Sequence, residues 1–226
     1  MRRLGLLAGS VLLLGACSSG EEPTPEPELA APRGRNMHVV STLVYAALPE
    51  APHRLAATYQ GPDLARWSIK READEDADRR IEYRVREAAF LLPQDSTTSI
   101  AYEGVERLRV LRRMELRRLA LSMGLDEVAW DDDGRVELAA ELGSVELREL
   151  EDGATELTCR TAEGEAEESL RITAWEPHGK GRRPAELELW FGAAHVWSET
   201  VTRFQVESWF KERYFWPPDR ADEAPE

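Results

Sequence analysis

The sequence of 226 residues carries 29 lysines and arginines against 43 aspartates and glutamates, a formal net charge of −14 at pH 7. A chain this acidic repels nucleic acid and anionic lipid surfaces at long range, which excludes nucleic-acid binding as a leading function. The length, less an N-terminal signal and linker, suits one domain with its own hydrophobic core.

Residues 1–16 have the pattern of a secretory signal peptide. Arg2 and Arg3 form the positive start, and an apolar run from Leu4 to Gly15 follows. The run is too short to cross a bilayer as a mature helix, which takes about 20 residues. The segment Leu14-Gly15-Ala16-Cys17 resembles the bacterial lipobox, in which the chain is cut before the cysteine and the thiol is lipidated. We therefore predict lipidation at Cys17; an ordinary signal peptide with a chance cysteine is the alternative.

Lipidation at Cys17 predicts a protein held at a membrane. Stable anchoring takes more than one acyl chain, and a bacterial lipoprotein anchor supplies several. By resemblance to the lipoproteins of enteric bacteria, Ser18 favours the outer membrane, with the protein facing the periplasm. The sequence holds only two cysteines, so Cys159 is left without an internal disulfide partner.

Residues 17–35 are expected to form the lipidated end and an extended tether. The segment combines prolines with glutamates: Pro23, Pro25, Pro27, Pro32, Glu21, Glu22, Glu26 and Glu28. Such a composition cannot bury a core, and at about 3.1 Å per residue it spans on the order of 50 Å. At the other end of the chain, residues 220–226 are expected to be a disordered tail.

Two segments of the folded region are predicted to be helices. Residues 37–48 are apolar and stop before Pro49, and residues 99–123 place a row of apolar side chains on one arc of a helical wheel. Arginines decorate the longer helix: Arg107, Arg109, Arg112, Arg113, Arg117 and Arg118. They are interpreted as a solvated face with glutamate partners; the alternative is a helix that lies near anionic lipid.

The rest of the folded region alternates apolar and polar residues with period two, as half-buried strands do. The alternating apolar positions include Ile81, Tyr83 and Val85, and Leu187 and Leu189. Glycine-containing turns separate about ten such segments, which favours an antiparallel meander. A sheet this long curls or closes. The prediction is an α+β domain over residues 36–219: a strongly curved antiparallel sheet, or half-open barrel, with a covering helix and a short N-terminal helix.

This order of elements resembles the LolA/LolB-like superfamily of periplasmic lipoprotein carriers. Residues 59–67, Tyr-Gln-Gly-Pro-Asp-Leu-Ala-Arg-Trp, are similar to its first hairpin, and residues 210–219 are similar to its closing strand. The resemblance implies an apolar cavity between sheet and helix that accepts acyl chains. On the helix side, the residues expected to face that cavity are Leu108, Leu111, Leu116 and Leu119. The seven tryptophans are interpreted as core filling, with cavity lining as the alternative.

The sequence contains no pattern typical of an enzyme or a metal site. It lacks a Gly-x-Ser-x-Gly elbow and a glycine-rich phosphate loop. Its four histidines have no zinc-ligand spacing. The run Asp131-Asp132-Asp133-Gly134 fails the calcium-loop spacing, since position 129 is alanine. We therefore predict no catalytic residue, no metal and no cofactor.

Two functions remain. The first is a membrane-anchored lipoprotein that binds a lipid or an acylated partner, such as a lipoprotein acyl chain, under a helical lid. The second is a solidly packed interaction or scaffold module of the cell envelope, with no ligand cavity. The size of any cavity beneath the long helix distinguishes them.

Overall fold

The computed structural model describes residues 36–73, 79–125, 128–139, 141–161, 166–207 and 210–225. The predicted signal peptide, Cys17 and the tether lie outside the described residues, as does Trp209. Among the described residues, no helix is long and apolar enough to cross a membrane.

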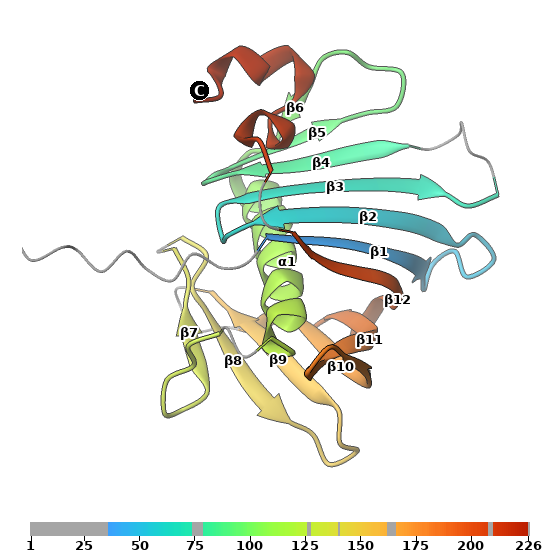
Figure 1. The fold of residues 1–226 in the computed structure, drawn as a ribbon, viewed down its shortest axis with the longest axis vertical. Helices are drawn as coiled ribbons and strands as arrows, with labels where there is room; N and C mark the ends of the chain where they lie inside the picture. Colours follow the sequence, from blue (N-terminus) through green and yellow to red (C-terminus); the bar gives the residue numbers. More distant parts are fainter. Residues whose placement is uncertain are drawn as a thin grey trace, which may run out of the picture. The chain divides into compact units, whose positions relative to one another are not determined.

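A single antiparallel sheet of 12 strands forms the framework (Figure 1). Its order is β6-β5-β4-β3-β2-β1-β12-β11-β10-β9-β8-β7, so the first and last strands of the chain pair at its centre. The strands are β1 (Asn36–Tyr45), β2 (His53–Gln60), β3 (Leu64–Arg71), β4 (Arg80–Val85), β5 (Ala88–Leu92), β6 (Ile100–Ala101), β7 (Arg135–Glu137), β8 (Ser144–Glu149), β9 (Thr155–Arg160), β10 (Ala166–His178), β11 (Gly181–Phe191) and β12 (Ala194–Glu207).

The antiparallel meander is confirmed, but the expected strand count of about ten was too low. The two strands missing from that count had been assigned to the predicted helices: Asn36–Tyr45 is strand β1, and Ile100–Ala101 is strand β6. The ladder is open, because it ends in β6 at one edge and β7 at the other. The half-open barrel is thus confirmed only in its coarser form, as an open antiparallel sheet with one main helix.

The predicted N-terminal helix over residues 37–48 is wrong, because Asn36–Tyr45 is strand β1. Met37, Val39 and Leu43 are buried against the helix side of the sheet. A register shift between Val40 and Ser41 interrupts the alternation, and a central strand is apolar on both faces. These two features together gave the segment the appearance of an apolar helix.

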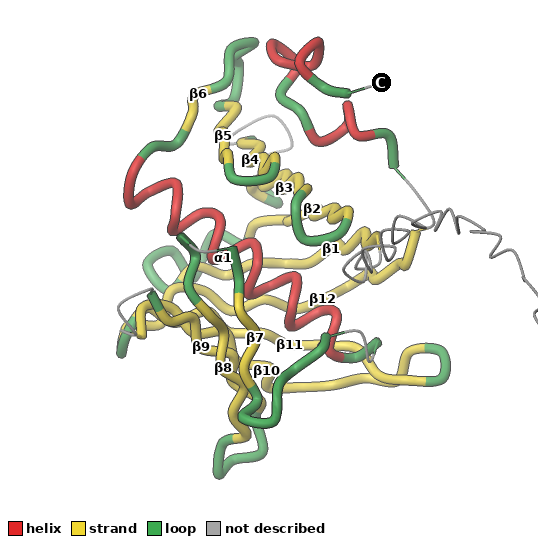
Figure 2. Tube along the Cα trace, turned by 90° about the vertical axis from the view of Figure 1, so that its left-hand side faces the viewer, coloured by secondary structure: helices red, strands yellow, loops and turns green. Residues whose placement is uncertain are grey.

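The long helix is confirmed as α1 (Gly104–Met123), which begins five residues later than predicted. Ile100 and Ala101 instead pair with β5 as strand β6. The chain leaves the sheet at one edge through β6, passes through α1, and re-enters at the opposite edge as β7. The helix therefore lies across one face of the sheet (Figure 2).

The helix ends where it meets β11. Gly124 has a φ of −69°, so a left-handed backbone conformation does not explain why this position is a glycine. A Cβ at this position would instead collide with the backbone carbonyl of Arg182. The glycine is needed for close approach of the two backbones.

The sheet has a core on each face. The main core lies between α1 and strands from both halves of the sheet. A smaller core on the opposite face contains Ile81, Tyr83 and Val85, covered by Phe215 of the C-terminal segment. That segment forms two short 3-10 helices, η1 (Glu212–Phe215) and η2 (Pro218–Glu223), on the other side of β3–β5 from α1 (Figure 2). Helix η2 includes residues 220–223, which the sequence assigned to a disordered tail.

Candidate functional site

The four leucines predicted to face a cavity lie on the sheet side of α1. Leu111, Leu116 and Leu119 are only 0–2% exposed and belong to the main core. Leu108 is partly buried and packs against it. At least three of the four side chains are therefore in close contact with their surroundings.

The six arginines of α1 do not form a solvated face. Each forms a hydrogen bond or an ion pair within the fold: Arg107 with Glu87 and Glu141, Arg109 with Glu106, Arg112 with Leu142, Arg113 with Glu168, Arg117 with Glu199, and Arg118 with Glu115. Two pairs lie within the helix, and the others reach loops or strands. Arg113 and Arg117 thus join α1 to strands β10 and β12 of the sheet.

Arg117 is the centre of a fully buried polar network. Its Nε lies 2.9 Å from Oε2 of Glu199, and both side chains are 0% exposed. Its Nη1 donates to the Tyr59 hydroxyl at 2.8 Å, and its Nη2 donates to Oγ of Ser41 at 3.1 Å. Trp67 Nε1 also donates to the Tyr59 hydroxyl, at 3.0 Å. The helix is thereby bonded to β12, β2 and β1 at the middle of the sheet.

The charges at this network are mutually stabilised. Burial alone would lower the pKa of Arg117, but the neighbouring Glu199 and Tyr59 outweigh burial and raise that pKa above its usual value. Burial raises the pKa of Tyr59, although Arg117 opposes it. Arg117 is therefore a permanent cation whose counter-ion is Glu199.

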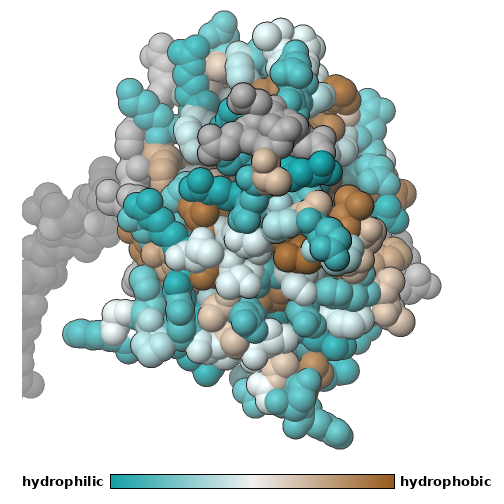
Figure 3. Space-filling view, turned by 90° about the vertical axis from the view of Figure 1, so that its right-hand side faces the viewer, coloured by the Kyte–Doolittle hydropathy of each residue, from teal (hydrophilic) through white to brown (hydrophobic). Residues whose placement is uncertain are grey.

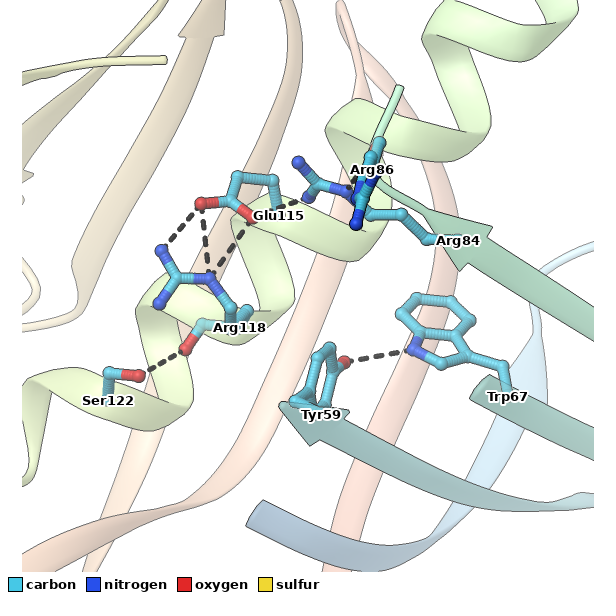
Figure 4. A network of polar contacts seen from close by, with 7 residues as sticks. All are labelled: Tyr59, Trp67, Arg84, Arg86, Glu115, Arg118 and Ser122. Carbon is cyan, nitrogen blue, oxygen red and sulfur yellow. Dashed lines mark hydrogen bonds and ion pairs between the residues drawn. The ribbon is translucent and has the colours of Figure 1, made fainter. Parts of the chain in front are cut away.

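Glu115 is held between two arginines (Figure 4). Its Oε2 lies 2.6 Å from Nη1 of Arg84 on β4, and its Oε1 lies 2.5 Å from Nη2 of Arg118. Burial works to raise the pKa of Glu115, but Arg118 and Arg84 outweigh it and hold that pKa below its usual value. Together with Arg113–Glu168 at 2.6 Å, these contacts are called the buried ion pairs below: Arg84–Glu115–Arg118, Arg113–Glu168 and Arg117–Glu199.

The buried ion pairs include residues that the sequence analysis left unassigned, and the strand pattern contained a signal for them. Glu168 shares the core-facing side of β10 with Leu170 and Ile172, and Glu199 shares that of β12 with Trp197 and Val201. A glutamate in register with buried apolar residues requires a cation nearby. The arginine-rich helix supplies it.

A cavity of about 570 Å³ adjoins the N-terminal half of α1. This helix-end cavity is bounded by Leu111 on the helix, by Ala139 and Leu142 before β8, and by Arg84 on β4. Exposed residues at its mouth, among them Arg86 and Glu87, open it to solvent. Leu111 is the one predicted leucine among the residues that line this cavity.

Tyr102, which lies between β6 and α1, has a strongly raised pKa. Burial, together with Glu82, raises the pKa of Tyr102 to about 12. A folded-state pKa above the usual value of about 10 means that unfolding is favoured as the pH rises from about 10 to 12. Tyr102→Phe should flatten the loss of stability in that window, measured by urea unfolding at several pH values, whereas Tyr214→Phe should leave the Tyr102 contribution in place. An unchanged slope in Tyr102→Phe would contradict the assignment.

Other sequence features have structural roles. Asp131 Oδ1 accepts hydrogen bonds from the backbone N–H of Asp133 and Arg135, so the acidic run is a turn into β7. Cys159 is buried, with its Sγ 3.7 Å from the carbonyl oxygen of Leu142. In the described parts of the chain, no three histidine, cysteine, aspartate or glutamate side chains cluster as metal ligands.

A scan of protein-family models and a search of curated proteins gave no match. The fold is similar to solved structures. A DUF1329 family protein from Desulfovibrio piger has a TM-score of 0.45 and 8% identity over 82% of this chain and 90% of its own. A putative outer membrane lipoprotein-sorting protein domain from Vibrio parahaemolyticus has a TM-score of 0.45 and 8% identity. The match covers 80% of this chain and 89% of that domain. A LolA superfamily protein from Nitrosomonas europaea has a TM-score of 0.46 and 9% identity. The match covers 82% of this chain and 91% of that protein. In each case the similarity is structural, at low sequence identity.

Proposed function

We propose that this protein is a lipid-anchored component of the bacterial cell envelope that binds a lipid or an acylated partner between its sheet and its helix. The observation that carries the proposal is the helix-end cavity of about 570 Å³. Ligand pockets in proteins have volumes of about 300–1,000 Å³. Arg107 and Leu111 of α1, Arg84 of β4 and the neighbouring loops border this cavity at one end of the helix.

The lining of the helix-end cavity suits an amphiphile. Leu111, Leu142 and Ala139 offer apolar surface for a hydrocarbon chain. Three arginines and three acidic residues balance one another in the lining: Arg84, Arg86, Arg107, Asp63, Glu87 and Glu141. An uncharged or zwitterionic acyl compound fits this balance better than a strongly charged one.

The proposal includes a sheet that wraps around the helix as a half-open barrel. Arg107 supports this. Its Nη1 donates to the carbonyl oxygen of Glu87 at 2.7 Å, and its Nη2 forms an ion pair with Glu141. Glu87 lies in the β4–β5 turn and Glu141 in the β7–β8 connection, near opposite edges of the strand order. One side chain that reaches both is consistent with curvature.

The helix is proposed to stay in place while a ligand binds. The buried ion pairs join α1 to β4, β10 and β12, and breaking a buried pair costs about 3–5 kcal/mol. A swinging lid would have to break several of them. We therefore infer that an acyl chain enters through the exposed mouth of the helix-end cavity.

Filling the cavity tests the proposal. Ala139 is an exposed residue in the lining, so Ala139→Trp should occlude the cavity without disturbing the core. We expect the affinity for a fluorescent monoacylglycerol to fall roughly tenfold, or about 1.4 kcal/mol. The control is Ala193→Trp, at an exposed position in the β11–β12 turn. Equal affinity in both variants would refute ligand binding in this cavity.

The anchor belongs to the same proposal. Cys17 is the proposed lipidated residue, residues 17–35 the tether, residues 36–219 the folded domain, and the outer membrane, facing the periplasm, the location. Cys17→Ala should release the protein from the membrane fraction of expressing bacteria into the soluble fraction. Cys159→Ala, which removes the other cysteine, should leave the distribution unchanged. A Cys17→Ala protein that still sediments with membranes would contradict lipid anchoring.

The packed interaction module is the second candidate. The observation that favours it is the main core, in which Leu116 and Leu119 are 0% and 2% exposed. Native mass spectrometry of the Cys17→Ala protein separates the two functions. Co-purified lipid favours the carrier, and repeated absence of lipid together with failure to bind the monoacylglycerol favours the module.

A further inference from the structure

We propose that a second cavity, lined by the ends of β1 to β5, binds an anionic amphiphile with a carboxylate or phosphate head and a short apolar tail. The cavity has a volume of about 390 Å³. It shares no lining residue with the helix-end cavity. The proposal goes beyond the proposed function, because it assigns another site with a different selectivity.

The apolar part of this arginine-rimmed cavity comes from alternate strands. Ile69 on β3 lies on the core-facing side with Trp67, and Leu91 on β5 shares the side of Ala89. Tyr45 at the end of β1 packs against the main core and contributes its ring. A tail of a few methylene groups would remove this apolar surface from water, which favours binding.

The polar rim is positively charged. Arg71, Arg79 and Arg80 line the cavity, and its lining in the described residues contains no carboxylate. Arg80 is held in place, because its Nη2 donates to the Tyr45 hydroxyl at 3.1 Å and its Nε lies 3.5 Å from Oε1 of Glu82. Guanidinium groups bind carboxylate and phosphate oxygens through paired, charge-assisted hydrogen bonds.

His53 points independently to a ligand. Its side chain lines the cavity and the residue is 8% exposed. Its Nδ1 is buried and has no hydrogen-bond partner among the described residues. The ring is fixed edge-on against Tyr45, with centroids 5.1 Å apart. Buried polar atoms nearly always have a partner, and an anionic oxygen in the cavity would accept a hydrogen bond from Nδ1–H.

The acidic character of the whole chain does not cancel this local charge. The formal net charge of −14 repels anions at a distance, but the Debye length is about 8 Å at physiological ionic strength. Within the cavity, the charges of the residues that line it therefore determine whether an anion is attracted or repelled. Figure 3 views the side of the molecule with the β1–β2 turn, where hydrophobic residues are scattered among hydrophilic ones.

Isothermal titration calorimetry with sodium octanoate as the probe tests the site. The protein is the full mature-length chain with Cys17→Ala. Octan-1-ol supplies the tail without the charge, and inorganic phosphate supplies a charge without the tail. We expect octanoate to bind more tightly than either. Equal affinity for octanoate and octan-1-ol, or equal affinity for octanoate and phosphate, would overturn the assignment of an anionic amphiphile.

Arg79→Gln is the diagnostic variant, and Arg54→Gln is its matched control. Arg54 is an exposed residue on β2, next to His53 but on the opposite face. Loss of one charge-assisted hydrogen bond should weaken octanoate binding roughly tenfold in Arg79→Gln and leave Arg54→Gln unchanged. Equal binding in the two variants would place the ligand elsewhere. Loss of octanoate binding in Ala139→Trp would assign the ligand to the helix-end cavity; the proposed function would then stand and this proposal would fall.

Substitutions in the segment between Arg71 and Arg79 provide one more test of the proposal. It carries Asp74, Glu75, Asp76 and Asp78, which lie outside the described residues. Changing all four to their amides removes carboxylates close in sequence to the arginines. Octanoate should bind this variant at least as tightly as the parent, because repulsion of an anion can only decrease. Weaker binding would contradict selection by the arginines.

Discussion

Glu199→Gln is expected to lower the free energy of unfolding by about 3–5 kcal/mol, the usual cost of breaking a fully buried ion pair. Glu199 and Arg117 are both 0% exposed. The glutamine removes the only charge paired directly with Arg117 in the described network and leaves its guanidinium buried and uncompensated. Urea unfolding of the Cys17→Ala protein, followed by tryptophan fluorescence, measures the change.

An exposed ion pair provides the matched control. Arg135 and Glu137 lie 2.8 Å apart with side chains 44% and 70% exposed, so Glu137→Gln should change stability by about 1 kcal/mol or less. The double variant Arg117→Met, Glu199→Leu should recover much of the loss, since apolar residues often replace buried ion pairs at little cost. A loss for Glu199→Gln no larger than that for Glu137→Gln would show that the pair does not hold the helix to the sheet.

Leu116→Ala is expected to lower the free energy of unfolding by about 2–5 kcal/mol. Leu116 is 0% exposed in the main core, so truncation should remove apolar contacts and leave a void. Leu48→Ala is the control, because Leu48 is 53% exposed and its truncation should cost about 0.5 kcal/mol or less.

The same pair of variants tests the role that the sequence suggested for Leu116. A leucine that faces a solvent-filled cavity makes few packing contacts, so its truncation removes little stabilisation. If Leu116→Ala costs no more than Leu48→Ala and weakens monoacylglycerol binding, Leu116 is a ligand-contacting residue. If it destabilises as expected and leaves that binding unchanged, its role is core packing.

Local patterns predicted much of the fold. In β11, Leu187 and Leu189 are buried and alternate with glutamates, as expected for a half-buried strand. The pattern failed at β1, which is central in the sheet and interrupted by an irregularity at Val40. Short apolar runs do not separate a buried strand from a helix by periodicity alone.

The candidate site was predicted less well, because its contacts are distant in sequence. Ile81, Tyr83 and Val85 were correctly placed on one face of β4, but they pack beneath the C-terminal segment. Arg84, from the other face, reaches Glu115 on α1. Composition cannot show which face of a strand the helix will cover. It also cannot pair Arg117 with Glu199, which is 82 residues away.

The pairing of β1 with β12 has a consequence for how the chain is assembled. Asn36 lies opposite Glu207, so the central seam of the sheet joins residues from the two ends of the folded chain. Each half, β1–β6 and β7–β12, can form from neighbours in sequence, but the seam must wait until β12 has been synthesised. Such long-range pairing is slow, and unpaired strand edges favour aggregation until it forms. The last strand therefore decides when folding is complete, and a chain that stops before β12 would expose β1 as an unprotected edge.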